Sequence, residues 1–498
     1  MSAAQMVRTE ARVQARERVW VYSGAASLAM AAALLVVDQA AARTAAPYVL
    51  LLEVGTVGVI FAASLTLLDR TVGVFAALSV TPRGVRGYVP ARVGVLTVIS
   101  LALATVVGAA GAHGRFAIVP VMVAVGLTAL LLDALSVAIA ARATSLFGFL
   151  SVAPWLLAPL LGVPLVWAVF TLDAPWLRLV PTVGAWELLQ AGYTPIPTGR
   201  LFADTAYLAL WTASAFVVAV RRIAAADTAS RPLTPTATPG RRARPRRRVP
   251  RRLAPAAIDA ANAFRNPLAL VLAASPLVLA AAVRLGLPPL AAWLSRAHGA
   301  ELTRLEPLIF SGVILLHVPY IFGVTATLLL LDDLDEGGLR ALSVSPLGVR
   351  GYLSYRTIST ALAALLAAIA ATVIVGTPDG IGWRRLGLAW LLAAGCAPLV
   401  PLTTAALANN RVHGFGILKV LGIAYYVPLV GWALHRWAQL LVGALPTYWP
   451  AALAWGERAP NPLILTLAGA GILVLATIVG LRLGERHLLR RTYAECVG

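Results

Sequence analysis

The sequence predicts an all-helical membrane protein with about twelve transmembrane helices, arranged as two six-helix repeats in parallel orientation. Three observations lead to this fold class: the composition, twelve separate apolar segments, and a motif that occurs twice. Apolar residues make up 59% of the chain and charged residues only 12%, and the mean hydropathy is +0.82. One water-soluble core cannot bury that much apolar surface, so we expect the chain to lie in a bilayer.

The apolar segments fall into two sets of six. A spanning helix needs about 20 predominantly apolar residues. Such segments lie at 19–38, 47–68, 88–112, 116–141, 146–171 and 203–222, and again at 268–285, 306–331, 352–376, 385–408, 414–435 and 461–481. The first follows several arginines, as a secretory signal would, but it is longer than the core of a signal. Its removal would also leave eleven spans, so we expect a first spanning helix.

The basic residues predict the orientation. If the N-terminus is cytoplasmic, 30 of the 41 basic residues lie on the cytoplasmic side. Because arginine and lysine are retained on that side, both termini are expected to be cytoplasmic. Lys419 is the only lysine, and alanine is abundant. Both biases are typical of a GC-rich bacterial genome, so we expect a bacterial plasma membrane.

A twelve-residue motif is written twice, as "ALSVTPRGVRGY" at 77–88 and "ALSVSPLGVRGY" at 341–352, 264 positions apart. At the same offset Asp69 and Gly73 correspond to Asp333 and Gly337, and Arg92 corresponds to Arg356. An even number of spans separates the copies, which therefore share one orientation. We predict six-helix domains at 1–222 and 257–498, joined by residues 223–256.

The predicted linker is rich in proline and arginine. Its central part, "RPLTPTATPGRRARPRRRVPRRL" at 231–253, cannot form a packed core and should be disordered or polyproline-like. Eight arginines lie between Arg241 and Arg252. A basic tract next to a membrane binds anionic lipid head groups. We therefore expect anionic lipids at this linker and no nucleic acid.

Each copy of the motif follows the second span of its half, on the predicted cytoplasmic side. Residues 69–80 and 333–344 are expected to form short amphipathic helices on the membrane surface, with Asp333, Asp335, Glu336 and Arg340 facing water. Glu336 and Arg340 are an i, i+4 pair. Thr81-Pro82 and Ser345-Pro346 then start the third span of each half. Such an element can pass force from a cytoplasmic partner to that span. The simpler alternative is that the motif only closes a loop.

The pattern of an acidic residue, three residues, glycine, "ALSV(T/S)P" and tyrosine resembles the permeases of ABC-2 type exporters. It is similar to their fused branch of fluoroquinolone or multidrug export proteins, in which two six-helix domains share one chain. The resemblance implies that the two surface helices are coupling helices seated in two cytoplasmic ATPase subunits. The expected coupling residues are Asp69, Gly73 and Pro82 in the first half and Asp333, Glu336, Gly337, Arg340 and Pro346 in the second. The first copy, "DRTVG", lacks the acidic cluster of "DDLDEGG", which bears on whether both ATPases dock equally.

The chain carries no catalytic signature of its own. A phosphate-binding P-loop needs a lysine after its glycines, and Lys419 stands between leucine and valine in a predicted span. No H-E-x-x-H zinc motif and no G-x-S-x-G nucleophile motif is present. We therefore expect no enzyme activity, metal or cofactor in this chain, with Mg-ATP bound by the partner ATPase subunits.

Three ionisable residues lie inside predicted spans: Glu53, Asp133 and His317. Such groups are costly in a bilayer and usually face a pathway or a helix interface. Glu53 and His317 occupy equivalent positions of the two halves, so they are candidates for the substrate pathway, where Glu53 could hold a cationic amphiphile. Hydrogen bonding between helices is the competing interpretation, and it is preferred for Asp133, whose counterpart near Pro401 is apolar.

The last outer connection of each half is rich in tryptophan and proline. These connections, "APWLRLVPTVGAWELLQAGYTPIPTGR" and "ALPTYWPAALAWGERAPNP", predict short helices at the outer mouth, with Trp186 and Trp449 as interface anchors.

Three classes of function remain. The leading one is the permease of an ATP-driven exporter of a hydrophobic or amphipathic compound such as a drug, an antibiotic or a lipid-like molecule. The alternative is a proton-coupled transporter of the major facilitator type. The segment "LLDRTVG" of this chain partly matches the Asp-Arg-x-Gly loop signature of such transporters, although the basic residues expected after the glycine are missing. A membrane enzyme or scaffold has no catalytic constellation to support it.

Overall fold

The computed structural model describes residues 2–79, 87–143, 146–170, 175–228, 267–298, 302–335, 348–434, 439, 442–456 and 461–497. Within these ranges every regular element is a helix, and twelve helices are long and apolar enough to cross a membrane. The all-helical, twelve-span prediction is therefore confirmed. Contacts divide the chain into unit 1, Met1–Arg247, and unit 2, Arg248–Gly498.

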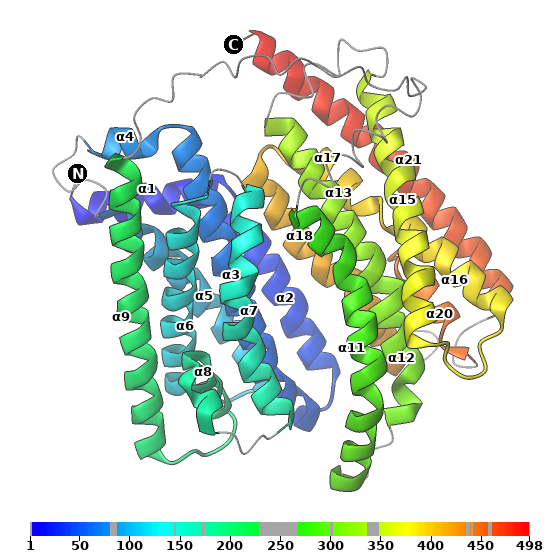
Figure 1. The fold of residues 1–498 in the computed structure, drawn as a ribbon, viewed down its shortest axis with the longest axis horizontal. Helices are drawn as coiled ribbons and strands as arrows, with labels where there is room; N and C mark the ends of the chain where they lie inside the picture. The colour runs from blue at the N-terminus through cyan, green and yellow to red at the C-terminus, as the bar shows by residue number, and fades with distance from the viewer. Residues whose placement is uncertain are drawn as a thin grey trace. The chain divides into compact units, whose positions relative to one another are not determined.

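Unit 1 is the blue-to-green part of Figure 1. Its elements are α1 (Ala3–Arg16), α2 (Val19–Val36), α3 (Gln39–Thr71), α4 (Val74–Ser79), α5 (Tyr88–Ala112), α6 (Ile118–Ala140), α7 (Leu146–Phe170), the 3₁₀ turn η2 (Pro175–Leu179), α8 (Pro181–Gln190) and α9 (Thr198–Thr228). Helix α6 forms the centre, because it packs against α3, α5, α8 and α9.

The two ends of unit 1 carry different short helices. Helices α1 and α4 lie at one end, and α8 lies at the other (Figure 1). The end with α1 and α4 is the one that the sequence predicts to be cytoplasmic. Each long helix in between is apolar on almost all sides, as a helix in a bilayer must be.

Helix α1 was not expected from the sequence. It starts at Ser2, whose hydroxyl accepts from the Gln5 backbone while the Gln5 side chain accepts from the Ser2 backbone. This reciprocal cap satisfies two backbone donors that a helix start leaves open. Met6, Glu10 and Gln14 recur every four residues and are buried, so one face of α1 packs against α5.

Unit 2 is the green-to-red part of Figure 1. Its elements are α11 (Pro267–His298), η3 (Leu302–Leu305), α12 (Glu306–Phe310), the π-helical turn η4 (Ser311–His317), α13 (Val318–Asp335), α15 (Gly348–Val375), α16 (Trp383–Cys396), α17 (Leu399–Leu407), α18 (Arg411–Tyr426), the 3₁₀ turn η5 (Val427–Ala433), α20 (Tyr448–Leu453) and α21 (Pro462–Val497). Together α12, η4 and α13 form one span, and α16 with α17 forms another.

The predicted surface helices do not begin where the sequence placed them. Asp69 belongs to the last turn of α3, which continues to Thr71, and Asp333 belongs to the last turn of α13. The second span can retain each carboxylate because an arginine of the next span pairs with it. Helix α4 starts only after Gly73, whose φ of 77° separates the second span, α3, from the helix that follows.

Several predicted features lie outside the described residues. These are Pro82, Glu336, Gly337, Arg340 and Pro346 of the repeated motif, and residues 229–266, which include most of the predicted linker. Helix α9 extends to Thr228, so the first residues of that predicted linker are helical.

Candidate functional site

In each half, three side chains join the second span to the third span. In unit 1, Asp69 ends α3, and Tyr88 and Arg92 stand one turn apart at the start of α5. The Tyr88 hydroxyl donates to Asp69 Oδ2 at 2.9 Å, and Arg92 Nη2 donates to the same oxygen at 2.6 Å. Arg92 Nη1 also donates to the Tyr88 hydroxyl, and its guanidinium lies 4.6 Å from the centre of the Tyr88 ring. We call this arrangement the first clasp.

Helix α1 completes the first clasp. The Glu10 carboxylate accepts hydrogen bonds from Arg92 Nε at 2.8 Å and from Arg92 Nη2 at 3.0 Å, in the bidentate geometry that suits a guanidinium and a carboxylate. Gln14 donates to Glu10 at 3.0 Å and to the Arg92 carbonyl at 3.3 Å. The Arg92 side chain is only 1% exposed. Two carboxylates thus hold one buried guanidinium, which ties α1, α3 and α5 together.

Burial and charge act in opposite directions on Glu10. Burial raises the pKa of Glu10, but the charge and hydrogen bonds of Arg92 outweigh burial and leave that pKa below the usual range. Glu10 therefore stays ionised at neutral pH, and α1 is held to the bundle by a charged contact.

Helix α4 also touches the first clasp. The Phe75 ring of α4 is buried and packs edge-on against the Tyr88 ring, with 5.1 Å between the ring centres. A displacement of α4 would therefore press on Tyr88 at the first turn of α5. Helix α4 thus contacts the start of the third span through Phe75. The predicted transfer of force through the Thr81-Pro82 corner stays a prediction, because that corner lies outside the described residues.

The same three residue types meet in unit 2, 264 positions later. The Tyr352 hydroxyl and Arg356 Nη2 both donate to Asp333 Oδ2, the second at 3.0 Å, and Arg356 Nε donates to the Tyr352 hydroxyl at 3.1 Å. The Arg356 guanidinium lies 5.2 Å from the centre of the Tyr352 ring. This second clasp is more open than the first, since the Asp333 side chain is 38% exposed and that of Asp69 is 12% exposed.

A neighbouring contact ties each second span to the connection between the fourth and fifth spans. In unit 1, Arg70 donates to the Ala141 carbonyl at 3.3 Å and to the Ala143 carbonyl at 2.7 Å. In unit 2, Asp332 receives Arg411 at 3.0 Å. The chemistry differs between the halves, but the same two elements are joined.

Sequence reasoning identified part of this site. It selected Asp69 and Asp333 and noted that Arg92 and Arg356 match, but it gave the arginines and tyrosines no role and expected Asp333 to face water. The available signal was the joint repetition of aspartate, tyrosine and arginine at a single offset. Glu10 had no such signal, because its contact with Arg92 crosses 82 positions.

The two pathway candidates are hydrogen-bonded within their own units. Glu53 of α3 is buried and receives the Ser27 hydroxyl of α2 at 2.6 Å. His317 ends the π-helical turn, and its Nδ1 lies 2.7 Å from the Tyr426 hydroxyl. Tyr320 and Tyr425 extend this group of rings. The π-turn is notable because such turns often lie at functional sites. That Glu53 and His317 meet a substrate stays a prediction.

Asp133 stands in the middle of α6 and is fully buried. Neither of its carboxyl oxygens has a hydrogen-bond partner among the described residues. The carboxyl group lies against Gly58 of α3, where an added Cβ would come within 1.6 Å of Oδ1. The expected hydrogen bond between helices is therefore not present at Asp133.

Comparisons with known proteins identify a family and two relatives. The family described as "Fluoroquinolones export permease protein Rv2686c-like" matches residues 259–482, which lie in unit 2. Two relatives from Mycobacterium tuberculosis, the fluoroquinolones export permease proteins MT2760 of strain CDC 1551 / Oshkosh and Rv2686c of strain ATCC 25618 / H37Rv, are each 30% identical over 204 residues. That alignment covers 40% of this chain and 79% of each relative. No solved structure matches the chain.

Proposed function

Because the chain belongs to the Rv2686c-like family of fluoroquinolones export permeases, we propose that it is the membrane-spanning subunit of an ATP-driven ABC exporter. Separate ATPase subunits bind Mg-ATP and hydrolyse it, and the chain itself binds no cofactor. The transported compound is hydrophobic or amphipathic and leaves the cell through the bacterial plasma membrane. The relatives' names support a fluoroquinolone as the first compound to test.

The repeated clasp carries this proposal. Each half joins its second and third spans through one aspartate, one tyrosine and one arginine, at positions 264 apart. Force applied next to a clasp would reach two spans at once. Two such points in one chain suit two copies of a cytoplasmic ATPase, and they support the view that two permease domains are fused here.

The coupling residues then divide into two kinds. Asp69 and Asp333 position the spans, because their carboxylates are engaged by arginine. Gly73 forms the joint before α4. Pro82, Glu336, Gly337, Arg340 and Pro346 remain the proposed contacts or corners next to the ATPase. In this arrangement both termini and both clasps face the cytoplasm.

Transport into inside-out vesicles tests the proposal. The chain is co-expressed with the genes beside its own, any ATPase among them being the candidate partner, and uptake of norfloxacin is measured with ATP. The matched control is the same ATPase with its P-loop lysine replaced, since that lysine reaches the phosphates. We expect uptake that requires ATP, disappears in the control and persists when a protonophore collapses the proton gradient.

One observation favours the proton-coupled alternative. Asp133 is a fully buried carboxyl group without a hydrogen-bond partner in the described structure, and buried acids of this kind occur in proton relays. In the vesicle assay, that alternative predicts uptake driven by a proton gradient without ATP, and Asp133→Asn would abolish it. Uptake of that kind would replace the exporter assignment.

A further inference from the structure

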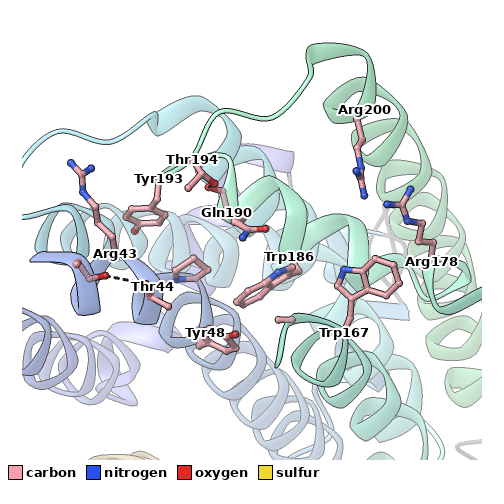
Figure 2. A pocket seen from close by; sticks show the side chains of 13 residues that line it. Arg43, Thr44, Tyr48, Trp167, Arg178, Trp186, Gln190, Tyr193, Thr194 and Arg200 are labelled. Carbon is pink, nitrogen blue, oxygen red and sulfur yellow. Dashed lines mark hydrogen bonds between the residues drawn. The ribbon is translucent and has the colours of Figure 1, made fainter. Parts of the chain in front are cut away.

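Unit 1 contains a cavity of about 720 Å³ at the end that carries α8 (Figure 2). This end is opposite to the first clasp, and the sequence predicts it to be the outer end. The volume lies within the range of small-molecule sites. The cavity is lined by the first turns of α3, the end of α7, η2, α8, the turn after α8, and the start of α9.

Aromatic rings form the middle of the cavity. Figure 2 shows Tyr48, Trp186 and Trp167 there, with Arg43 at one side and Arg178 and Arg200 at the other. The Tyr48 and Trp186 rings contact each other, with centres 4.4 Å apart and planes inclined by 57°. Tryptophan is common at membrane interfaces. Here, however, Trp186 is buried and lines a cavity, so its ring faces protein and not lipid.

The arginines at the right of Figure 2 are already paired. Arg200 donates to Glu187 through Nε at 2.6 Å and also through Nη2, and Arg178 Nη2 lies 3.3 Å from the same carboxylate. Arg178 also lies over Trp167, 5.4 Å from the ring centre. These contacts fix the wall of the cavity.

Arg43 is different. It is exposed on the second turn of α3. Its guanidinium makes no hydrogen bond or ion pair with any residue that the structure describes. It therefore offers the cavity a full positive charge and five donors.

The cavity is positive overall. Arg43, Arg178 and Arg200 contribute three positive charges, while Glu187 and its hydrogen-bonded neighbour Asp204 contribute at most two negative charges. Burial and the adjacent Asp204 raise the pKa of Glu187 to about 7. Protonation of Glu187 would make the cavity more positive still.

Further donors point to a ligand rich in acceptors. Besides Arg43, the lining donors with no partner among the described residues are the Tyr48 hydroxyl, the Gln190 amide and the indole N–H groups of Trp167 and Trp186. Polar groups that line a cavity and have no internal partner are available to a ligand. A carboxylate or phosphate accepts such bonds, and an apolar body can lie on the rings.

The corresponding positions in unit 2 carry other residues. Pro307, Gly443 and Leu465 stand where unit 1 has Arg43, Arg178 and Arg200, at offsets of 264 and 265. Trp432, the counterpart of Trp167, packs edge-on against Trp455 with 5.8 Å between ring centres, and Tyr448 packs on the same ring at 5.9 Å. The basic, aromatic cavity is thus a property of unit 1 and not of the repeated helix arrangement.

We propose that this cavity binds an organic anion, namely a carboxylate or phosphate joined to an apolar body. Arg43 contacts the anionic group, and Tyr48, Trp167 and Trp186 contact the apolar body. Binding here requires neither ATP nor a partner, so the site can be tested in the isolated full chain whether or not the export function holds.

The test compares two probes of the same shape. Binding of naphthalene-2-carboxylate and of the neutral naphthalene-2-carboxamide is measured by calorimetry on the full chain in nanodiscs of zwitterionic lipid. The carboxylate is expected to bind more tightly. Arg43→Gln should weaken carboxylate binding about tenfold, because it removes a charged hydrogen bond, and should leave carboxamide binding unchanged.

Two more variants guard against indirect effects. Arg115→Gln removes an exposed arginine from the turn between α5 and α6 that does not line the cavity, and it should change the binding of neither probe. Thr44→Trp fills the cavity from an exposed position whose hydroxyl bonds only to the Ala40 carbonyl, and should abolish binding of both probes. Equal binding of the two probes, or equal effects of Arg43→Gln and Arg115→Gln, would overturn the proposal.

The anion can come from solution or from a lipid head group. Repeating the measurement with phosphatidylglycerol in the nanodisc separates these sources. If the wild-type chain loses carboxylate binding in phosphatidylglycerol and keeps it in neutral lipid, the lipid competes for the cavity, and a lipid head group is the occupant. Unchanged carboxylate binding identifies a soluble organic acid.

Discussion

At the scale of single residues, Arg92 is the most constrained group in the clasps. It is almost completely buried and is paired with both Glu10 and Asp69. Arg356 has the same position in unit 2, but its partner Asp333 is much more exposed. Removing one member of a buried ion pair leaves an uncompensated charge, whereas an exposed pair contributes little. The first clasp should therefore contribute more to the free energy of unfolding than the second.

Arg92→Met should lower the free energy of unfolding by about 3 kcal/mol, because it leaves two carboxylates buried without a counter-charge. Arg356→Met should cost about 1 kcal/mol, because water screens Asp333. The measurement is chemical unfolding of the full chain in nanodiscs, with tryptophan fluorescence as the signal. Equal losses in the two variants would contradict the larger stabilisation expected from the more buried first clasp.

The attachment of α1 should depend on pH. Because the folded pKa of Glu10 is lowered, its contribution to stability is fully present above the usual glutamate pKa of 4.5 and is lost as pH falls through the lower folded value. A spin label on Val7→Cys, at an exposed position of α1, should become more mobile as the pH falls below 4.5. The same label with Glu10→Gln should show no such transition. An identical transition in both proteins would assign it to another group.

At the scale of elements, Gly73 forms the joint between α3 and α4, where the proposed coupling to an ATPase would act. Gly73 has a φ of 77°, and apart from its chain neighbours no described residue comes within 4 Å of the position that its Cβ would occupy. A side chain there would meet no neighbour, so any cost of substitution comes from the backbone alone. Helix α4 then reaches the first clasp through Phe75.

Gly73→Ala should therefore destabilise the chain by about 1 kcal/mol. Gly94→Ala is the matched control, because Gly94 lies inside α5 with the same open space and a helical backbone. That variant should be neutral or slightly stabilising, since alanine favours helices. Thermal unfolding of both variants in nanodiscs checks the difference. A stable Gly73→Ala chain would mean that the joint does not need its left-handed conformation.

The elements differ in how far the sequence could predict them. The twelve spans were predictable, because length and hydropathy fix them almost independently of context. Helix α1 was missed because its 14 residues include a polar face, and its buried Glu10 makes sense only beside Arg92. The start of α4 was misplaced by several residues, because an acidic residue was taken as a sign of exposure. Asp69 shows the reason: a distant arginine can retain an acid inside a helix.

At the scale of the whole molecule, the chain has two units with a common plan and different details. Both carry a clasp between their second and third spans. Unit 1 adds α1 at its clasp and a basic, aromatic cavity at its other end. In unit 2 the three cavity arginines are replaced by Pro307, Gly443 and Leu465, and Trp432 packs against Trp455. We infer that the repeated clasps serve the proposed coupling to an ATPase in both halves. The features that only unit 1 carries, α1 and the cavity, then serve tasks that unit 2 does not share.

The measurement that tests this account most directly is the native mass of the tagged chain, purified in mild detergent after co-expression with the genes beside it. The account predicts a complex of one chain and two ATPase subunits. Charge reversal of Glu336 should release ATPase without unfolding the chain, and Arg115→Gln should release none. A chain that purifies alone, keeps its full transport activity and uses only a proton gradient would contradict the account.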